Sequence, residues 1–297
     1  MKNEKILLPT GALRYTLTND FLFKAFLQQN EEALKGLLCA LLDLKKEDIK
    51  SITIINPIEE GDSIEEKTLV LDIKLLLNMN EIINIEMQVE DLGNWEERSL
   101  TYLCRAFDHL HAGEDYRNVK RTIHIGILDF TPKGFPKEFY MDYYLYNRKC
   151  EHIYSDKLSI RMLQLNQLEK IEDKEKETEL YYWARLFKAT TWEEIAMLAE
   201  KSESINEGIV TLKKLSEDEK IRMQCEAREN YRRDMASAIQ HGEEKGIRAV
   251  ILDNMEQGVS KEQIIEKLEK LFDLEESLAT EYYKQYGGNR NNNKVNS

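Results

Sequence analysis

The sequence predicts an α/β layer followed by an all-helical C-terminal region. Three observations support this fold class: helical and strand periodicities alternate in the first half, all four prolines precede residue 137, and the chain is helical and heavily charged from about residue 167. We therefore expect an α/β domain over residues 1–166 and a helical region over 167–286. The low-complexity polar tail over 287–297 is expected to be disordered.

The first predicted elements are two helices within residues 18–43, where apolar residues recur at helical spacing. Asn30 is expected to separate them. Three residues are candidates for the first N-cap: Thr18, Asn19 and Asp20. A strand over 48–57 should follow and end at Pro57, because proline cannot donate to a strand ladder.

A β-hairpin follows, with strands over 67–77 and 82–90 joined by the turn Asn-Met-Asn-Glu. An amphipathic helix is then expected from Asn94 to Gly113, a residue type that commonly ends helices. Further strands are predicted over 121–130, 141–147 and 157–165. The remaining helical stretches are predicted over 172–201, 205–245 and 260–286.

Composition bounds the protein's class. With 42% hydrophobic residues the chain can bury a core, and its formal net charge of −13 argues against generic polyanion binding. The four cysteines are widely spaced without a CxxC pair, which favours a reducing compartment. We see no signal peptide and no apolar run long enough for a membrane span, so we expect a cytoplasmic protein without a membrane partner.

The hairpin carries an unusual set of polar residues. Side chains alternate faces along a strand, so the apolar rows can pack on the core while Asp72, Glu86 and Gln88 point the same way. Two converging carboxylates repel each other unless a cation or proton intervenes, and oxygen ligands of this kind suit Mg²⁺. The alternative is an ordinary solvated face, which antiparallel sheets often have.

An Asp followed at hairpin spacing by Glu-x-Gln resembles the PD-(D/E)xK nuclease motif. The segments "TNDFLFKAF", "LDIKLLL", "INIEMQ", "ERSLTYLCRAF" and "HAGEDYRNVKRTIHIGILDF" are similar to the PD-(D/E)xK nuclease family transposases, also called Rpn recombination-promoting nucleases. The resemblance covers roughly residues 15 to 250. It implies a restriction-endonuclease-like α-β-β-β-α-β core, a mixed sheet flanked by helices, followed by the all-helical region.

The resemblance implies roles in metal binding. Asp72 and Glu86 would be the ligands, helped by the Met87 carbonyl, and the metal would activate an attacking water. Mg²⁺ is the expected ion, with Mn²⁺ and Ca²⁺ as alternatives. Asp20 matches the family's acidic helix residue, although it could equally be an N-cap.

Gln88 stands where many relatives have a lysine. A glutamine orients water or phosphate by hydrogen bonds but brings no charge. Lys24, one helical turn from Asp20, and Lys74, on the strand face of Asp72, are candidates to supply that charge. The alternative for each is a solvated lysine.

Five residues are candidates for contact with DNA: Arg98, Tyr102, Arg117, Lys120 and Arg121. Arg98 and Tyr102 match family positions, although the Tyr102 ring could instead pack in the core. The other three form the densest basic cluster, which could place a DNA backbone or be a local surface patch. The five histidines show no zinc-binding spacing.

The expected function is a metal-dependent DNA endonuclease that hydrolyses phosphodiester bonds in double-stranded DNA, in recombination, mobile-element or defence processes. One alternative is a catalytically inactive DNA-binding or assembly protein that keeps the nuclease fold. Another is a homo-oligomeric module built through the C-terminal helices, although "RENYRRDMASA" interrupts a long heptad pattern.

Overall fold

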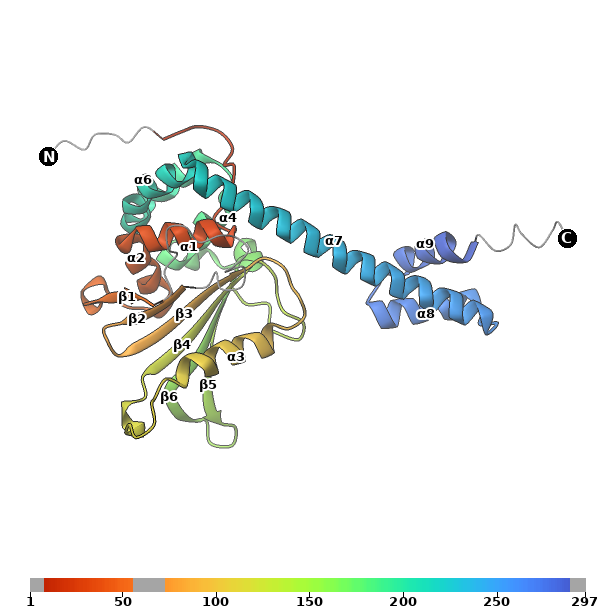
Figure 1. The fold of residues 1–297 in the computed structure, drawn as a ribbon, viewed down its shortest axis with the longest axis horizontal. Coiled ribbons are helices and arrows are strands. Elements are labelled where there is room, and N and C mark those ends of the chain that lie inside the picture. Colours follow the sequence, from red (N-terminus) through yellow and green to blue (C-terminus); the bar gives the residue numbers. More distant parts are fainter. Residues whose placement is uncertain (1–7, 56–72, 289–297) are drawn as a thin grey trace. The chain divides into compact units, whose positions relative to one another are not determined.

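The computed structural model describes residues 8–55 and 73–288 (Figure 1). The predicted ligand Asp72, residues 67–72 of the first hairpin strand and the last residues of the predicted polar tail lie outside the described residues. The chain divides into two compact units, residues 1–228 and 229–297. The predicted domain boundary at residue 166 does not coincide with the boundary between these units, because the helices that follow the sheet belong to its hydrophobic core.

The first unit contains a mixed sheet whose described strands have the order β1-β2-β3-β4-β6-β5. β1, β2 and β3 pair antiparallel, β3 and β4 pair parallel, as do β4 and β6, and β5 pairs antiparallel with β6. The strands are β1 Ile52–Ile54, β2 Ile73–Leu77, β3 Glu81–Gln88, β4 Arg121–Leu128, β5 Tyr140–Asn147 and β6 His152–Gln164.

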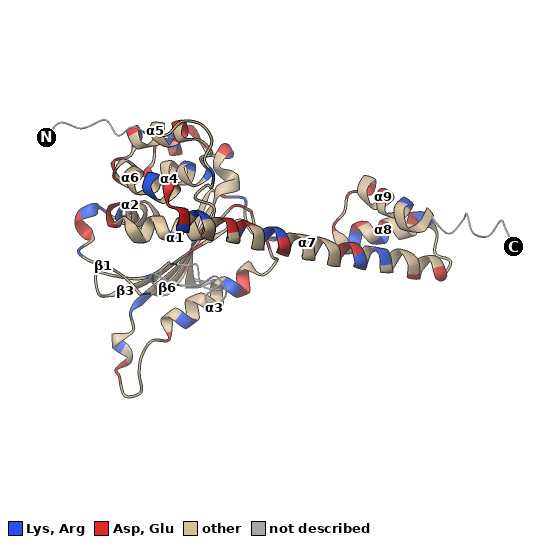
Figure 2. Cartoon of the chain, turned by 45° about the horizontal axis from the view of Figure 1, so that its top comes forward, with Lys and Arg blue, Asp and Glu red and all other residues tan. Residues whose placement is uncertain are grey.

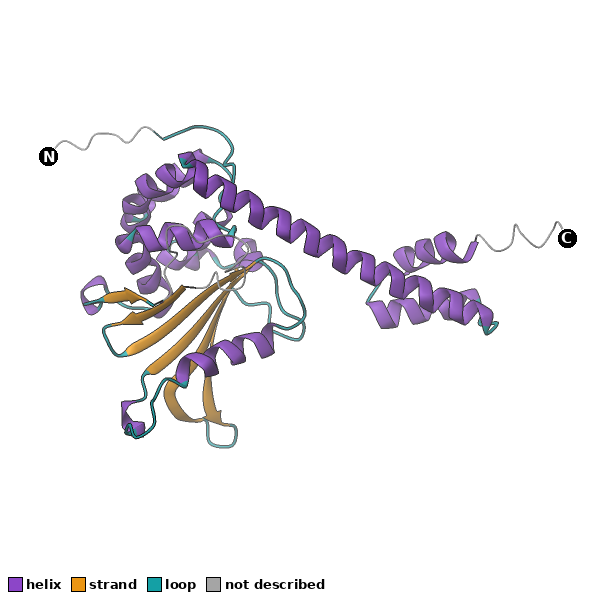
Figure 3. Ribbon diagram, in the orientation of Figure 1, coloured by secondary structure: helices purple, strands orange, loops and turns teal. Residues whose placement is uncertain are grey.

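Helices cover both faces of this sheet (Figures 1 and 3). Helix α3 lies across one face and contacts β3, β4 and β6. The other face carries the main core, which is formed with α1, α2 and α4 to α6. The helices are α1 Asp20–Gln29, α2 Glu31–Leu42, α3 Trp95–Phe107, α4 Glu179–Lys188, α5 Trp192–Lys201, α6 Glu203–Glu217 and α7 Glu219–Glu256.

The observed elements confirm most of the predicted order and fold class. Asn19 is the N-cap of α1, since its side chain accepts a hydrogen bond from the Leu22 amide at 3.2 Å. Asn30 separates α1 from α2 as expected and caps α2 through the Ala33 amide at 2.8 Å. The turn between β2 and β3 places Asn78 and Met79 at positive φ, the backbone that a tight hairpin requires.

Several predicted helical stretches end earlier or are divided in the structure. Helix α3 ends at Phe107, not at Gly113, because the His109 ring and main chain both bond the Phe107 carbonyl. The stretch 172–201 contains two α-helices, since Thr191 and Glu194 form a capping box that starts α5. Residues 205–245 are divided by Asp218, whose carboxylate accepts from the Ile221 amide near the start of α7.

The second unit is helical. It contains the later part of α7 together with α8 Lys261–Phe272 and α9 Glu276–Gly287, so the predicted stretch 260–286 is also two helices. Its small core joins residues from all three helices: Ile247, Ile251, Ile264, Ile265, Leu268 and Ala279. Lys, Arg, Asp and Glu are interspersed along these helices (Figure 2). Within the described ranges, no helix is both long and apolar enough to cross a bilayer.

Candidate active site beneath helix α3

Glu86 is buried between the sheet and helix α3. It belongs to β3, where Ile83 and Ile85 face the main core while Asn84 and Glu86 face α3. Asn84 is 2% exposed and Glu86 5%. The alternative of a solvated polar face is therefore wrong, because α3 covers it.

Arg98 of α3 neutralises the buried carboxylate. Its Nε donates to Oε1 of Glu86 at 2.6 Å, and its Nη2 lies 2.5 Å from the same oxygen. Gln88 Nε2 donates to that oxygen as well, at 2.9 Å. The Arg98 guanidinium also lies over the Tyr102 ring, 5.0 Å from its centroid, and Nη2 is 3.3 Å from the Tyr102 hydroxyl. Four predicted site residues thus converge.

His124 of β4 lies beside Glu86 in the same buried layer. Parallel pairing of β3 with β4 sets His124 against Asn84, whose Nδ2 is 3.1 Å from His124 Nδ1. If Asn84 donates there, the ring proton lies on Nε2, which is 3.8 Å from Glu86 Oε2. Burial, and secondarily Arg98, lowers the pKa of His124 from 6.5 to about 3, so the ring is neutral at ordinary pH.

Trp95 and Gly126 fix the position of α3 over this layer. Gly126 pairs with Glu86 in the strand register. A Cβ atom at Gly126 would lie 2.1 Å from Cη2 of Trp95, so the indole needs the bare glycine backbone. The Trp95 and Tyr102 rings flank His124 at centroid distances of 5.6 and 5.9 Å. This aromatic packing holds Arg98 at the carboxylate.

The two predicted α1 residues lie on the other side of the sheet from α3. Asp20 is 7% exposed and pairs with Arg228 of α7, whose Nε donates to Oδ1 at 3.0 Å. Lys24 is 4% exposed, so the alternative of a solvated lysine is wrong for it. Lys74 is half-buried and pairs in register with Asn84, which places it on the α3 face.

Asp72 and Met87 are the remaining predicted metal ligands. Asp72 lies outside the described residues. The Met87 side chain packs in the main core, 4% exposed, so only its carbonyl is a candidate ligand. Both assignments stay predictions.

The predicted basic cluster lies at the far end of the strands. Arg121 begins β4 and forms an ion pair with Glu81 at 3.5 Å. Glu81 lies five residues before Glu86 on β3, so the two carboxylates are separated by about 16 Å along the strand. Arg117 is exposed and bound to Asp115, and Lys120 is half-buried. The structure does not bring this cluster to Glu86, and its role in DNA binding stays a prediction.

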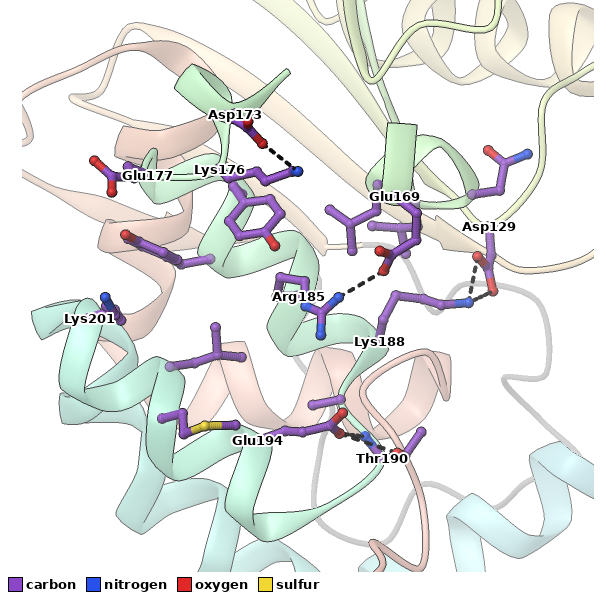
Figure 4. Close-up of a pocket in the computed structure, with 18 residues that line it drawn as sticks. Asp129, Glu169, Asp173, Lys176, Glu177, Arg185, Lys188, Thr190, Glu194 and Lys201 are labelled. Carbon is purple, nitrogen blue, oxygen red and sulfur yellow. Dashed lines mark hydrogen bonds and ion pairs between the residues drawn. The ribbon is translucent and has the colours of Figure 1, made fainter. Parts of the chain in front are cut away.

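A separate cavity of about 970 Å³ lies between α4, α5 and the segment after β6 (Figure 4). Its charges are largely paired: Lys188 binds Asp129 at 2.7 Å and Arg185 binds Glu169 at 2.8 Å. Among the described lining residues, acidic side chains outnumber basic ones and none is a predicted site residue. The cavity therefore lacks the surplus positive charge that a DNA phosphate requires.

The described oxygen atoms at Glu86 are of the type that a hard cation binds, but they are too few to complete its coordination. The carboxylate offers oxygen ligands, and Gln88 keeps its amide oxygen while its nitrogen bonds Glu86. The Arg98 guanidinium already places a positive charge on Oε1 of Glu86. Within residues 8–55 and 73–288, no three His, Cys, Asp or Glu side chains gather as a metal site. A Mg²⁺ ion would therefore need water and a ligand such as Asp72.

Four residues of this layer were not predicted as site residues from the sequence: His124, Asn84, Trp95 and Gly126. The available signal was alternation: Thr122, His124 and Gly126 are polar or small at every second position of an otherwise apolar strand. That pattern matches Asn84, Glu86 and Gln88 on β3. Only the parallel pairing of the two strands shows that both sets share one buried layer.

The mixed sheet flanked by helices, with Glu-x-Gln on its third strand, defines a protein of the PD-(D/E)XK fold class. A family model described as PD-(D/E)XK nuclease family transposase matches residues 17–242, and the chain belongs to this family. The resemblance drawn from the sequence is thus confirmed. Searches among curated proteins and among solved structures gave no match.

Proposed function

We propose that the protein is a metal-dependent endonuclease that hydrolyses phosphodiester bonds of double-stranded DNA. The observation that carries this proposal is the buried Glu86 carboxylate, ringed by Arg98, Gln88 and His124, on the third strand of a nuclease-family sheet. Burying a carboxylate is costly without a cation, so the fold maintains an acid where the family's chemistry needs one.

Each proposed role follows from position and chemistry. Asp72 and Glu86 would hold the ion, with the Met87 carbonyl as a further oxygen donor, and Mg²⁺ is preferred over Mn²⁺ or Ca²⁺. When bound, the ion would polarise the scissile phosphate and lower the pKa of a coordinated water. Gln88 orients the Glu86 carboxylate by its hydrogen bond.

Positive charge near the reaction would come from this chain's own cations. Lys74 shares the α3 face and is the better placed of the two lysines, because Lys24 comes from α1 on the opposite face. Asp20, bound to Arg228 on the other side of the sheet from α3, is proposed as a support for α1, and only the family resemblance supports its role as an outer ligand. The chain is further proposed to act in the cytoplasm, in recombination, mobile-element or defence processes.

Plasmid cleavage tests the proposal. Supercoiled DNA is incubated with Mg²⁺ or Mn²⁺ and the wild type, Asp72→Ala or Glu86→Gln. We expect both variants to lose about 100-fold or more of the cleavage rate, because the ion supplies several kcal/mol of transition-state stabilisation. Glu81→Gln is the matched control, a carboxylate on the same strand but bound to Arg121 at its other end. Equal cleavage by wild type and Asp72→Ala would indicate a contaminating nuclease.

A second candidate function is DNA binding or assembly without cleavage. Two observations favour it: position 88 holds an uncharged glutamine rather than a lysine, and Arg98 occupies the Glu86 carboxylate. No cleavage by the pure wild type, together with DNA binding in anisotropy measurements, would support it.

We further propose that the chain can form a homo-oligomer through its C-terminal helices. Sedimentation of the full chain tests this, and a monomer would contradict it.

A further inference from the structure

We propose that Arg98 is an exchangeable counter-ion: it holds Glu86 in the metal-free protein and moves to a DNA phosphate when a divalent cation takes the carboxylate. The inference rests on the proposed function and adds a coupling between metal and DNA binding at that site. Its basis is the position of one guanidinium between a buried acid and a more exposed aromatic ring.

The contact occupies one of the two carboxylate oxygens that a metal could use. Nε and Nη2 of Arg98 both lie within 2.6 Å of Oε1 of Glu86. Arginine remains charged at every pH that a folded protein encounters, so this cation cannot leave by losing a proton. A divalent cation on the same oxygen would repel the guanidinium at close range in a poorly hydrated site. A divalent cation that takes Oε1, alone or together with Oε2, would therefore displace the guanidinium.

Arg98 is the partner that can move. The Glu86 side chain is 6% exposed and fixed on a central strand, with Gln88 and His124 beside it. The Arg98 side chain is 31% exposed and extends from a helix on a long, flexible stem. Release of the contact therefore moves the guanidinium and leaves the carboxylate in place.

The Tyr102 ring gives the released guanidinium a nearby surface. Arg98 already lies over that ring, and Nη2 reaches the hydroxyl at 3.3 Å. A planar guanidinium stacked on an aromatic face keeps its donor fork open for the two oxygens of a phosphate. Arg98 thus fits the DNA contact that the sequence predicts, but only after it leaves Glu86.

The exchange makes metal and DNA binding mutually favourable. A phosphate that binds Arg98 releases Glu86 to the cation, and a cation that binds Glu86 releases Arg98 to the phosphate. Coupling free energies are reciprocal, so each ligand raises the affinity for the other by the same factor. The protein without DNA then binds metal weakly, which keeps the site unloaded away from DNA.

Calorimetric titration with Ca²⁺ at about pH 8 tests this exchange. The full chain is titrated with and without a short DNA duplex, and gels confirm that the duplex stays intact. For the wild type, the duplex should raise Ca²⁺ affinity about tenfold. Arg98→Gln should bind Ca²⁺ about tenfold more tightly than the wild type without DNA and gain little from the duplex. Arg98→Lys, which keeps the charge, should stay close to the wild type without DNA.

Arg105→Gln is the matched control, because Arg105 is an exposed arginine near the end of the same helix. It should bind Ca²⁺ like the wild type, with and without DNA. The salt dependence adds a readout that structural damage would not imitate: Arg98→Gln should lower the slope of log affinity for DNA against log salt by about 0.9, one phosphate contact. Thermal melting shows that each variant is folded.

The outcomes separate this inference from the proposed function. Equal or weaker Ca²⁺ binding by Arg98→Gln, while Glu86→Gln abolishes binding, would overturn the exchange but leave the metal site standing. Should Arg98→Gln fail to fold, the wild type alone decides: a Ca²⁺ affinity indifferent to DNA overturns the exchange. Absence of Ca²⁺ binding in every protein, with and without DNA, would overturn both proposals.

Discussion

Replacing Gly126 by alanine should displace helix α3 from the sheet. The new Cβ would lie 2.1 Å from Cη2 and 2.3 Å from Cζ2 of Trp95, whereas ordinary contact begins at 3.4 Å. The ring must therefore retreat by about 1.3 Å, but it is only 3% exposed and packs against Leu128 and Met162. Helix α3 has to lift or the indole has to leave its rotamer.

The cost follows from the size of that displacement. Overpacking a well-filled site costs about 1–3 kcal/mol, and a rigid ring on a central strand belongs in the middle of that range, at about 2 kcal/mol. For a unit of roughly 200 residues, this corresponds to a melting temperature lower by about 4–8 °C. Because Arg98 lies one turn after Trp95, its contact with Glu86 should weaken too.

Urea and thermal denaturation of the full chain measure the effect, and a double-mutant cycle assigns its cause. In the Trp95→Leu background the smaller side chain leaves room, so Gly126→Ala should then cost under about 1 kcal/mol. An equal cost of Gly126→Ala in both backgrounds would refute the steric argument. So would an unchanged melting temperature in the Gly126→Ala single variant.

Three further predictions concern stability. His124 has a pKa of about 3 in the folded protein against 6.5 in the unfolded chain. As pH falls through this window the unfolded chain takes up the proton first, so the free energy of unfolding drops by up to about 1.4 kcal/mol per pH unit. His124→Gln should flatten that slope in urea titrations, and an unchanged slope would contradict this. Arg228→Met leaves the Asp20 carboxylate buried without this cation and should cost about 3 kcal/mol, much of it recovered by adding Asp20→Asn; no recovery would argue against the ion pair as the cause. Gly242→Ala places a methyl group in open space within α7 and should stabilise that helix by about 0.5–1 kcal/mol, seen as higher helicity on heating; destabilisation would contradict the open surroundings of this position.

The sequence specifies local structure well where one side chain acts on its own neighbours. Asn30 could be predicted as a break because asparagine caps helices, and its amide also bonds Glu207 and Thr211 of α6. The start of α5 was predictable from Thr191 and Glu194, which form a capping box at ordinary spacing. The end of α3 was not, because it depends on the His109 ring bonding the Phe107 carbonyl.

Period-two alternation predicts that Glu86 and Gln88 share a face, and the structure agrees. It does not say whether that face meets water or a helix. The answer depends on Gly126, which lies forty residues further along and admits the Trp95 indole. Pairing across such a separation is a property of the whole fold, so single-segment patterns miss the neutral His124 beside the acid.

The face of the sheet beneath helix α3 is partly polar, whereas the face on the side of α1 is apolar. Its buried residues are Trp95, Ser99, Leu103 and Ala106, and beneath them lie the imidazole and amide of His124 and Asn84. When the helix detaches, hydration of these two groups offsets part of the cost of exposing its apolar side chains to water. Amide hydrogens of α3 should therefore exchange through a local unfolding of lower free energy than those of α1. The same opening would expose Glu86 to solvent more fully than movement of the Arg98 side chain alone.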